Sequence, residues 1–408
     1  MDAVHCLVIG GGAAGMMAAV AAAGRGEGVV LLEGNRQLGR KILVSGNGRC
    51  NLTNLDADSP RHYHGGDPGF VGSALAQFPT ARTLAFFAEL GIETHEEKRG
   101  RLFPRSDQAQ SVVEVLEDRL QVLGATVTRE ARVVSLTGPA PFVARAVDGR
   151  QWQAERVVLA SGGTSLAKLG ADRSGLDLAV GLGHACTPLY PGLVPLESPD
   201  VHVHRMQGVK VVAEVRAPVA GRPPAVDTDD LLFTAYGVSG FTVLNLSAVL
   251  VPQLARGPAD LRVNLFPGRS PEQVSEILRD RWARNPHRSL EASFAGLLSS
   301  KLVGPFLERF GFSRETPVSR LSKEERWRLA RSLTDWPIRV TGPRSFEHAE
   351  VTIGGIRTGE VDPHTLESRL VPGLYLAGEI LDVHGDLGGY NFQWAWSSGW
   401  MVGQGLTS

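Results

Sequence analysis

A glycine-rich turn close to the N-terminus constrains the fold of this chain more than any other feature. The turn, residues 10–15, has the pattern G-x-G-x-x-G and directly follows the apolar run 4–9. The segment 13–23 that leaves the turn is rich in alanine, and a second apolar run occupies 29–32. Short apolar runs are typical of buried parallel strands, and alanine favours a helix. This order predicts a right-handed βαβ unit.

Each glycine of the pattern has a physical role if the unit binds a dinucleotide. Gly10 permits the tight turn, Gly12 lets backbone N–H groups approach a pyrophosphate, and Gly15 lets the helix pack closely on the strand. Glu33 ends the second strand, where a carboxylate can accept hydrogen bonds from ribose hydroxyls. The alternative is a turn that holds no nucleotide, and the pattern alone does not distinguish FAD from NAD.

Length and composition exclude several classes of protein. The chain has 408 residues, 43% of them hydrophobic, a net charge of -1 and no apolar run long enough to span a membrane. The first strand begins so early that no room remains for an export signal. The cysteines, Cys6, Cys50 and Cys186, contain no C-x-x-C pair and are typical of a reducing compartment. We therefore expect a soluble cytoplasmic protein without a metal site.

Strand-like and helix-like segments alternate along the chain, with a change of character in its middle. Residues 34–54 are dense in Gly, Arg and Asn and are interpreted as an extended loop. Strand candidates at 209–215 and 230–234 are separated by a Pro/Gly loop at 218–227. Further strands are expected at 131–136, 142–146 and 156–160, and helices at 83–90, 111–123, from 271 onward, at 290–302 and at 323–333.

The stretch 39–54, which contains the run GRCNLTN, separates the cofactor alternatives. It resembles the signature of a bacterial flavoprotein family of aminoacetone-oxidase-like and bile-acid-dehydroxylation-reductase-like enzymes, which also includes an rRNA dihydrouridine synthase. Further blocks of resemblance occupy 100–106, 160–165, 237–240 and 371–395. They keep the order of the family and span nearly the whole chain. The resemblance implies an FAD-dependent oxidoreductase.

The fold class that follows is α/β, with a Rossmann-type FAD-binding domain of the glutathione-reductase type on a parallel sheet. A β-barrel-like domain and a small helical domain are inserted into it. We expect the FAD-binding domain at 1–185 and 346–408, the β-rich substrate domain at 186–267 and 336–345, and the helical insertion at 268–335.

The last block has a physical basis of its own. The apolar run 374–377 ends at Gly378, where backbone N–H groups can bind the ribityl chain and phosphate of a flavin. The pair Gly388-Gly389 precedes a helix, whose unpaired N–H groups and dipole can stabilise an anionic reduced flavin. The alternative is an ordinary turn before a core helix. Because both ends of the chain must meet one cofactor, 374–377 should join the sheet of 4–9.

Two side chains are candidates for proton transfer. Cys50 stands next to Arg49, whose guanidinium would lower the pKa of the thiol and make it a competent acid or nucleophile. The alternative is a small buried residue that supports the loop. His384 is the flavin-side histidine candidate, against the alternative of a solvated turn residue. Arg40, Lys41 and Arg49 are either contacts to phosphate or a substrate anion, or surface charge.

The residues expected to contact the cofactor come from all of these segments. They are Gly10, Gly12, Ala13, Ala14, Gly15, Glu33, Arg40, Lys41, Ser45, Gly46, Gly48, Arg49, Cys50, Asn51, Val134, Ser161, Gly162, Gly163, Gly378, Glu379, Gly388, Gly389, Tyr390, Asn391 and Phe392. On the substrate side the chain departs from the family. It has Ala235 where a histidine is usual, Phe241 for a proline and Ser174 for an aspartate, so a possible substrate-side proton donor is missing.

Three functions are compatible with these features. The first is a reductase that passes hydride from NAD(P)H through FAD to an activated carbon–carbon double bond of a small molecule. No second G-x-G-x-x-G follows a strand, so NAD(P)H would dock transiently. The second is an amine oxidase of the aminoacetone type that produces hydrogen peroxide. None of these features specifies the oligomeric state.

The third function is the conversion of an rRNA uridine to dihydrouridine. Residues 268–340 contain 14 Lys/Arg and 9 Asp/Glu, a net charge of +5 in a chain whose total is -1. A basic segment of this kind either holds a phosphate backbone or is a solvated helix face. The arginines that would hold RNA are Arg279, Arg281, Arg284, Arg288, Arg326, Arg328 and Arg331.

Overall fold

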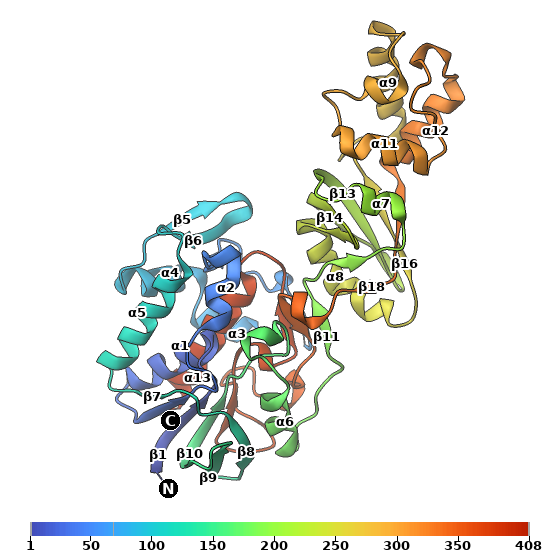
Figure 1. Cartoon of the computed structure of the whole chain (residues 1–408). Coiled ribbons are helices and arrows are strands. Elements are labelled where there is room, and N and C mark those ends of the chain that lie inside the picture. The colour runs from blue at the N-terminus through green and yellow to red at the C-terminus, as the bar shows by residue number, and fades with distance from the viewer. Residues whose placement is uncertain (1, 68, 407–408) are drawn as a thin grey trace. The chain divides into compact units, whose positions relative to one another are not determined.

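The computed structural model describes residues 2–67 and 69–406, and its chain forms two compact units (Figure 1). One unit consists of Met1–Tyr190 and Glu350–Ser408, and the other of Pro191–Ala349. Along the chain, the second unit is therefore inserted into the first. A further division of this insertion at 268 and 335 remains a prediction.

The first unit is built on a seven-stranded, mainly parallel sheet. Its strands are β1 (Asp2–Ile9), β2 (Val29–Leu32), β7 (Thr126–Thr128), β8 (Val133–Thr137), β9 (Phe142–Ala146), β10 (Gln151–Leu159) and β20 (Leu374–Leu376). The order is β7-β2-β1-β10-β9-β8, and β20 pairs in parallel with the C-terminal half of β10. Because β1 pairs in parallel with the same strand β10, the two ends of the chain share one sheet. This arrangement confirms the expectation for 374–377.

Two helices pack closely against each other in this unit (Figure 1). They are α1 (Ala13–Ala23) and α13 (Tyr390–Gly405), and nearly every side chain of α1 is buried. A methyl group on Gly399 would lie 2.3 Å from the carbonyl oxygen of Ala14, so a larger residue would push the backbones apart. The glycines of α13 thus let the last helix of the chain lie against the first.

The prediction of an extended loop at 34–54 is wrong for its middle part, which forms α2 (Arg40–Gly48). This helix packs against α5 (Ala109–Val122) and buries Ile42, so tertiary packing outweighs the high content of Gly, Arg and Asn. The helix is kinked near its end, because Gly46 and Asn47 have left-handed φ values of 56° and 58°.

The remaining elements of the first unit are short. They are β3 (Thr53–Asn54), β4 (Tyr63–Gly65), α3 (Gly72–Gln77), α4 (Thr80–Glu89), β5 (Thr94–Glu97), β6 (Arg101–Pro104), α6 (Ser174–Gly181), β19 (Val351–Ile353) and β21 (Val383–Gly385), while β11 (Tyr190–Gly192) lies at the boundary. Strands β3, β6 and β5 form one antiparallel sheet, and β4 pairs antiparallel with β21.

The inserted unit contains a seven-stranded antiparallel sheet in the order β17-β16-β13-β14-β15-β12-β18. Its strands are β12 (Leu196–Glu197), β13 (Lys210–Val219), β14 (Arg222–Thr234), β15 (Gly237–Ser239), β16 (Ala259–Asn264), β17 (Trp336–Val340) and β18 (Gly342–Pro343). Its helices are α7 (Val201–Arg205), α8 (Phe241–Leu254), α9 (Pro271–Arg284), α10 (Leu290–Ser293), α11 (Ser300–Arg309) and α12 (Lys323–Thr334).

Two expectations for this unit need correction. The Pro/Gly loop predicted at 218–227 is mostly strand, because β13 and β14 pair as far as Val219 and Arg222 and leave only a two-residue turn. The prolines of β14 are tolerated in a part of the strand that has β13 as its only neighbour. The single helix predicted at 290–302 is divided into α10 and α11, with Gly296 at a φ of 77° between them.

Each unit has an apolar interior. In the inserted unit, Trp336 stacks on Phe233 with their ring centres 5.4 Å apart, and Phe306 contacts the same indole edge-on. In the first unit, the buried cluster is formed by the strands of the parallel sheet and the helices on it. No helix among residues 2–67 and 69–406 is long and apolar enough to cross a membrane.

Candidate functional site

The three glycines that define the G-x-G-x-x-G pattern, Gly10, Gly12 and Gly15, differ in the space around them. A methyl group on Gly10 would lie 2.6 Å from the carbonyl oxygen of Ala160, and one on Gly15 would lie 1.9 Å from that of Gly10. A methyl group on Gly12 would meet nothing within 4 Å. Gly10 and Gly15 thus serve close packing, whereas Gly12 leaves open space at the start of α1, next to Ala13 and Ala14. This geometry fits a pyrophosphate site.

The carboxylate of Glu33 is fixed at the same end of the sheet. Its Oε2 accepts a hydrogen bond from the N–H of Gly11 at 2.8 Å, and its Oε1 accepts one from the N–H of Asn35 at 2.8 Å. The guanidinium of Arg40 donates to Asn35 Oδ1 at 2.9 Å. Glu33 is buried but reaches the glycine turn, which is the position that a ribose-binding carboxylate needs.

Val134 lies on β8, at the end of the sheet, and half of its surface is exposed. Three residues earlier, the N–H of Ala131 donates to the carbonyl oxygen of Glu33 at 2.8 Å. The chain before Val134 therefore passes beside the ribose-binding acid. A contact of Val134 with the adenosine end of the cofactor stays a prediction.

The residues after β10 divide into an open and a packed part. Gly162 has a φ of 76°, and a methyl group there would meet nothing within 4 Å. The hydroxyl of Ser161 is buried and finds no hydrogen-bond partner among the described residues. A methyl group on Gly163, in contrast, would lie 2.4 Å from Thr352 Oγ1. Gly162 can therefore face a ligand, whereas Gly163 is required by packing and the Ser161 side chain lies against Gly175 of α6.

Lys41 and Glu379, both predicted to contact the cofactor, form an ion pair with each other. The Nζ of Lys41 also donates to Ser165 Oγ at 2.9 Å, and Glu379 Oε1 accepts from the N–H of Thr352 at 2.7 Å. Because its charge is balanced by Glu379, Lys41 is a weaker phosphate ligand than a lone lysine would be. The pair instead ties α2 to the segment after β20, where Gly378 lies.

The pKa expected for Cys50 is wrong. Burial raises the pKa of this thiol to about 12, and its side chain has no exposed surface. The guanidinium of Arg49 does not activate it, because Arg49 pairs with Glu97 at 2.6 Å and stacks over the ring of Phe103. A buried, protonated thiol fits the alternative interpretation of Cys50 as a small residue that supports the loop. The nearby Ser45 hydroxyl donates to the carbonyl of Ile42 at 2.7 Å.

The loop around Asn51 contacts the start of α13. Asn51 Oδ1 is buried and finds no hydrogen-bond partner in the part of the chain that the structure describes. A methyl group on Gly389 would lie 3.0 Å from this oxygen and 2.5 Å from the backbone of Thr53. Gly46 and Gly48, in the kinked end of α2, have positive φ values. The backbone of the loop thus lies against the start of α13, and Asn51 Oδ1 is left without a partner and can bind a ligand.

The first turn of α13 has the features of an anion site. Gly388 and Gly389 have φ values of 133° and 104°, and the N–H groups of the first turn have no acceptor within the helix. The side chain of Asn391 is already used, because it accepts from the N–H of Gly385 and donates to its carbonyl oxygen at 2.7 and 3.0 Å. Phe392 stacks on Trp396. Contact through the backbone of Tyr390, Asn391 and Phe392 stays a prediction.

Sequence reasoning missed a cluster of histidines beside this turn. His64 on β4 lies opposite His384 on β21, with ring centres 5.5 Å apart. Asp386 Oδ2 lies 2.8 Å from His62 Nδ1, and Asp386 Oδ1 lies 2.7 Å from His64 Nε2. We call His62, His64, His384 and Asp386 the histidine cluster. His62 ends a short turn before β4 and His64 lies on that strand, so no local pattern in the sequence indicated the cluster.

His384 is present in this cluster but in an unexpected state. It is buried rather than solvated, and its Nδ1 finds no hydrogen-bond partner among residues 2–67 and 69–406. Burial lowers the pKa of His384 to about 4, and the neighbouring His64 contributes in the same direction. At neutral pH the ring is uncharged, so His384 can orient a ligand but is a poor source of protons.

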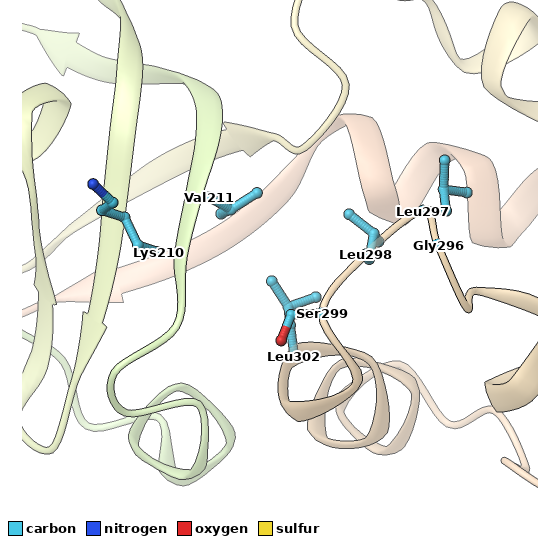
Figure 2. A pocket seen from close by; sticks show the side chains of 7 residues that line it. All are labelled: Lys210, Val211, Gly296, Leu297, Leu298, Ser299 and Leu302. Carbon is cyan, nitrogen blue, oxygen red and sulfur yellow. The ribbon is translucent and has the colours of Figure 1, made fainter.

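The inserted unit has a separate pocket of about 270 Å³ (Figure 2). Val211 on β13 lines one side, and Leu298, Ser299 and Leu302 line the other. None of the predicted site residues lines it. Within the described part of the chain, no group of three His, Cys, Asp or Glu side chains could hold a metal ion.

The fold and the site together define a Rossmann-type nucleotide-binding enzyme, and comparison with known proteins gives the family. The model of the HI0933-like protein Rossmann domain matches residues 4–405, so the chain belongs to this family of FAD-dependent oxidoreductases. It is 40% identical to a 3-dehydro-bile acid delta(4,6)-reductase of Clostridium scindens over 402 residues, 97% of each chain. It is 35% identical to the ribosomal RNA dihydrouridine synthase of Escherichia coli over 408 residues, 100% of this chain and 98% of that one.

Solved structures with the same fold are more distant in sequence. A 3-ketosteroid delta1-dehydrogenase from Sterolibacterium denitrificans has a TM-score of 0.54 and 14% identity, with 100% of this chain and 99% of that chain covered. A 3-ketosteroid-delta4-(5alpha)-dehydrogenase from Rhodococcus jostii has a TM-score of 0.52 and 15% identity, with 100% and 97% covered. These likenesses confirm the predicted fold class.

Proposed function

We propose that this enzyme uses FAD to reduce a carbon–carbon double bond that is activated by a carbonyl group. The supporting observation is the full-length similarity to two kinds of relative whose names describe this type of reaction. One name describes the reduction of double bonds in a 3-oxo bile acid, and the other describes the formation of dihydrouridine from uridine. In both reactions, two hydrogens are added across a double bond next to a carbonyl group.

The residues of the site fit FAD. The open backbone at Gly12 and Gly162 has room for the pyrophosphate, and Glu33 is placed to accept hydrogen bonds from the ribose. The orphaned Asn51 Oδ1 and the first turn of α13 are suited to the flavin, since the helix N-terminus favours negative charge at the edge of a reduced ring. When bound, FAD supplies the hydride chemistry, and the protein supplies orientation and protons.

The electron donor in this proposal is NAD(P)H. The chain carries one G-x-G-x-x-G turn after a strand, and the FAD would occupy it. A nicotinamide would therefore dock at the flavin without a nucleotide-binding domain of its own. Oxygen is the competing redox partner, which would make the protein an oxidase that releases hydrogen peroxide.

An rRNA uridine is the second candidate substrate, favoured by the similarity to the E. coli enzyme. The basic helices give it limited support. Arg281 donates to the carbonyl oxygen of Ser293, Arg326 donates to Ser275, and Arg328 lies over the ring of Phe312. These arginines hold the helices together and are less available to phosphate. Arg284, Arg288 and Arg331 are exposed.

The experiment uses the purified full-length protein loaded with FAD. Under nitrogen, NADPH or NADH should bleach the flavin, and a 3-oxo-Δ4 steroid should then restore its colour. If neither nucleotide bleaches the flavin, the proposal that NAD(P)H is the electron donor is refuted. Restoration of colour by oxygen with release of peroxide, but not by the steroid, would favour the oxidase. Mass analysis of rRNA from a deletion strain tests the uridine substrate.

A further inference from the structure

Three members of the histidine cluster, His62, Asp386 and His64, belong to a hydrogen-bonded chain of four side chains that begins at Asp56. Asp56 Oδ2 lies 2.8 Å from His62 Nε2, and the other nitrogen of His62 lies 2.8 Å from Asp386 Oδ2. The second oxygen of Asp386 then contacts His64 Nε2 at 2.7 Å. Half of the Asp56 side chain is exposed, whereas most of His62 is covered. The chain therefore fixes the ring of His64, whose own side chain is 36% exposed.

This chain is attached to the turn that is expected to hold the flavin. The N–H of Asp386 donates to the carbonyl oxygen of His62 at 2.9 Å, and the ring of His62 stacks on Tyr390 with their centres 4.3 Å apart. Tyr390 is the first residue of α13 and follows Gly389 directly. The side chain of Asn391 holds the neighbouring Gly385. A movement of α13 would therefore move the histidines with it.

The hydrogen bonds of the chain keep its two carboxylates, Asp386 and Asp56, in the charged form. Burial alone would raise the pKa of Asp386, but hydrogen bonds from His64 and His62 outweigh it and lower that pKa. Hydrogen bonds from His62 and Arg61 lower the pKa of Asp56. Both carboxylates thus remain charged at neutral pH and are not proton donors.

The other titratable groups around the cluster do not compete. Burial raises the pKa of Tyr390 to about 12 and that of Tyr63 well above its ordinary value. His384 is neutral at pH 7, as described above. The charge of Asp58 raises the pKa of Tyr63, and the charge of Arg99 acts in the opposite direction on that of Tyr390. Cys50 is fully buried and contacts the Ser45 hydroxyl, which offers no proton from solvent.

We propose that His64, oriented by Asp386 and linked through His62 to Asp56, donates the proton in the reduction proposed above. The inference rests on that proposed function. The double bond accepts a hydride from reduced FAD at one carbon and a proton from the His64 imidazolium at the carbon next to the carbonyl group. The substrate gains two electrons, FAD is left oxidised, and NAD(P)H reduces it again. His64 is left neutral, and because 36% of its side chain is exposed, it regains its proton directly from solvent.

A first test observes the chain without any turnover. In protein labelled with ¹⁵N-histidine, the ring N–H groups that contact Asp386 should give downfield proton signals. An asparagine offers a single acceptor oxygen, so Asp386→Asn should remove at least one of the two signals. Glu27→Gln is the matched control, because it neutralises the carboxylate of the separate His5–Glu27 pair on another part of the unit. Two unchanged signals in Asp386→Asn would overturn the chain described here.

A second test measures how fast a 3-oxo-Δ4 steroid reoxidises the pre-reduced flavin. His64→Gln should bind FAD with an unchanged spectrum but react about 100-fold more slowly, as expected for the loss of a general acid. The rate of the wild-type protein should fall at alkaline pH, and that of His64→Gln should not. Added imidazole should restore part of the rate of His64→Ala, which a merely structural role would not allow. Glu27→Gln should react like the wild-type protein.

The outcomes separate the two proposals. If the steroid and other enones never reoxidise the wild-type flavin, the proposed function fails and the proton donor fails with it. If the wild-type protein reacts and His64→Gln reacts equally fast, only the role of His64 is refuted.

Discussion

The carboxylate of Glu33 accepts a hydrogen bond of 2.8 Å from the backbone N–H of Gly11. This bond joins the end of β2 to the glycine turn after β1, so the acid that would bind a ribose is fixed beside the turn that would bind the pyrophosphate. The bond places two distant sequence features within one cofactor site. It also makes the contribution of each feature measurable.

Replacement of Glu33 by alanine should weaken FAD binding. A hydrogen bond to a charged group contributes about 1.5–3 kcal/mol, which corresponds to roughly a 10- to 150-fold higher Kd. Titration of the apoprotein with FAD, followed by flavin fluorescence, measures this change. Glu27→Ala, in the turn before β2, should leave the Kd unchanged. Equal affinities of Glu33→Ala and the wild-type protein would contradict the assignment of the ribose site.

Gly12 and Gly15 should respond in opposite ways to substitution. Gly12→Val should leave the melting temperature of the apoprotein nearly unchanged but abolish FAD binding, because its side chain would fill the open space of the turn. Gly15→Ala should destabilise the fold itself, since the added methyl group would lie 1.9 Å from the Gly10 carbonyl oxygen. Calorimetry and FAD titration of both variants distinguish the two effects. A Gly12→Val protein that still binds FAD would argue against a pyrophosphate at this turn.

Cys50 should be unreactive in the folded protein. Its thiol is buried and its pKa is raised to about 12, whereas Cys186 is partly exposed. Iodoacetamide at pH 8 should therefore label Cys186 first and reach Cys50 only after unfolding, which mass spectrometry of peptides can follow. Cys50→Ala should retain bound FAD and its rate of flavin reoxidation. Rapid labelling of Cys50 in the native protein would restore it as a reactive group.

His384 should make the protein less stable in acid. Its pKa falls from the ordinary value of 6.5 to about 4 in the folded state, so the unfolded chain binds more protons between these values. The free energy of unfolding should therefore decrease as the pH falls from 6.5 to 4, by roughly 3 kcal/mol from this group alone. Urea unfolding of wild-type protein and His384→Gln at both pH values measures the difference. An equal pH dependence in the two proteins would show that His384 is not buried as a neutral ring.

The features that the sequence predicted well are local. Short apolar runs and the spacing of glycines predicted the turn with Gly12 and the strand before it. An apolar run followed by a glycine likewise predicted the end of β20. The histidine cluster depends instead on β4 and β21, which have three residues each and pair across about 320 positions of the chain. Strands of three residues are too short to show an alternation of apolar and polar side chains in the sequence. Their pairing is decided by tertiary packing.

The chemistry of individual side chains was the least predictable part. Arg49 is adjacent to Cys50 in the sequence, yet its charge is directed to Glu97. Lys41 is balanced by Glu379, which lies 338 positions away. Neighbours in sequence suggested a free cation at each place, whereas the fold supplies a carboxylate to both. The pKa of a residue thus depends on partners that a local pattern does not contain.

The central claim is that reduced FAD in this protein transfers hydrogen to an enone. The most direct measurement mixes anaerobically reduced protein with one equivalent of a 3-oxo-Δ4 steroid and determines the mass of the steroid and the absorbance of the flavin. The account predicts that the steroid gains two hydrogens while one equivalent of oxidised flavin appears. A steroid of unchanged mass beside a flavin that stays reduced, in protein that oxygen reoxidises rapidly, would contradict it.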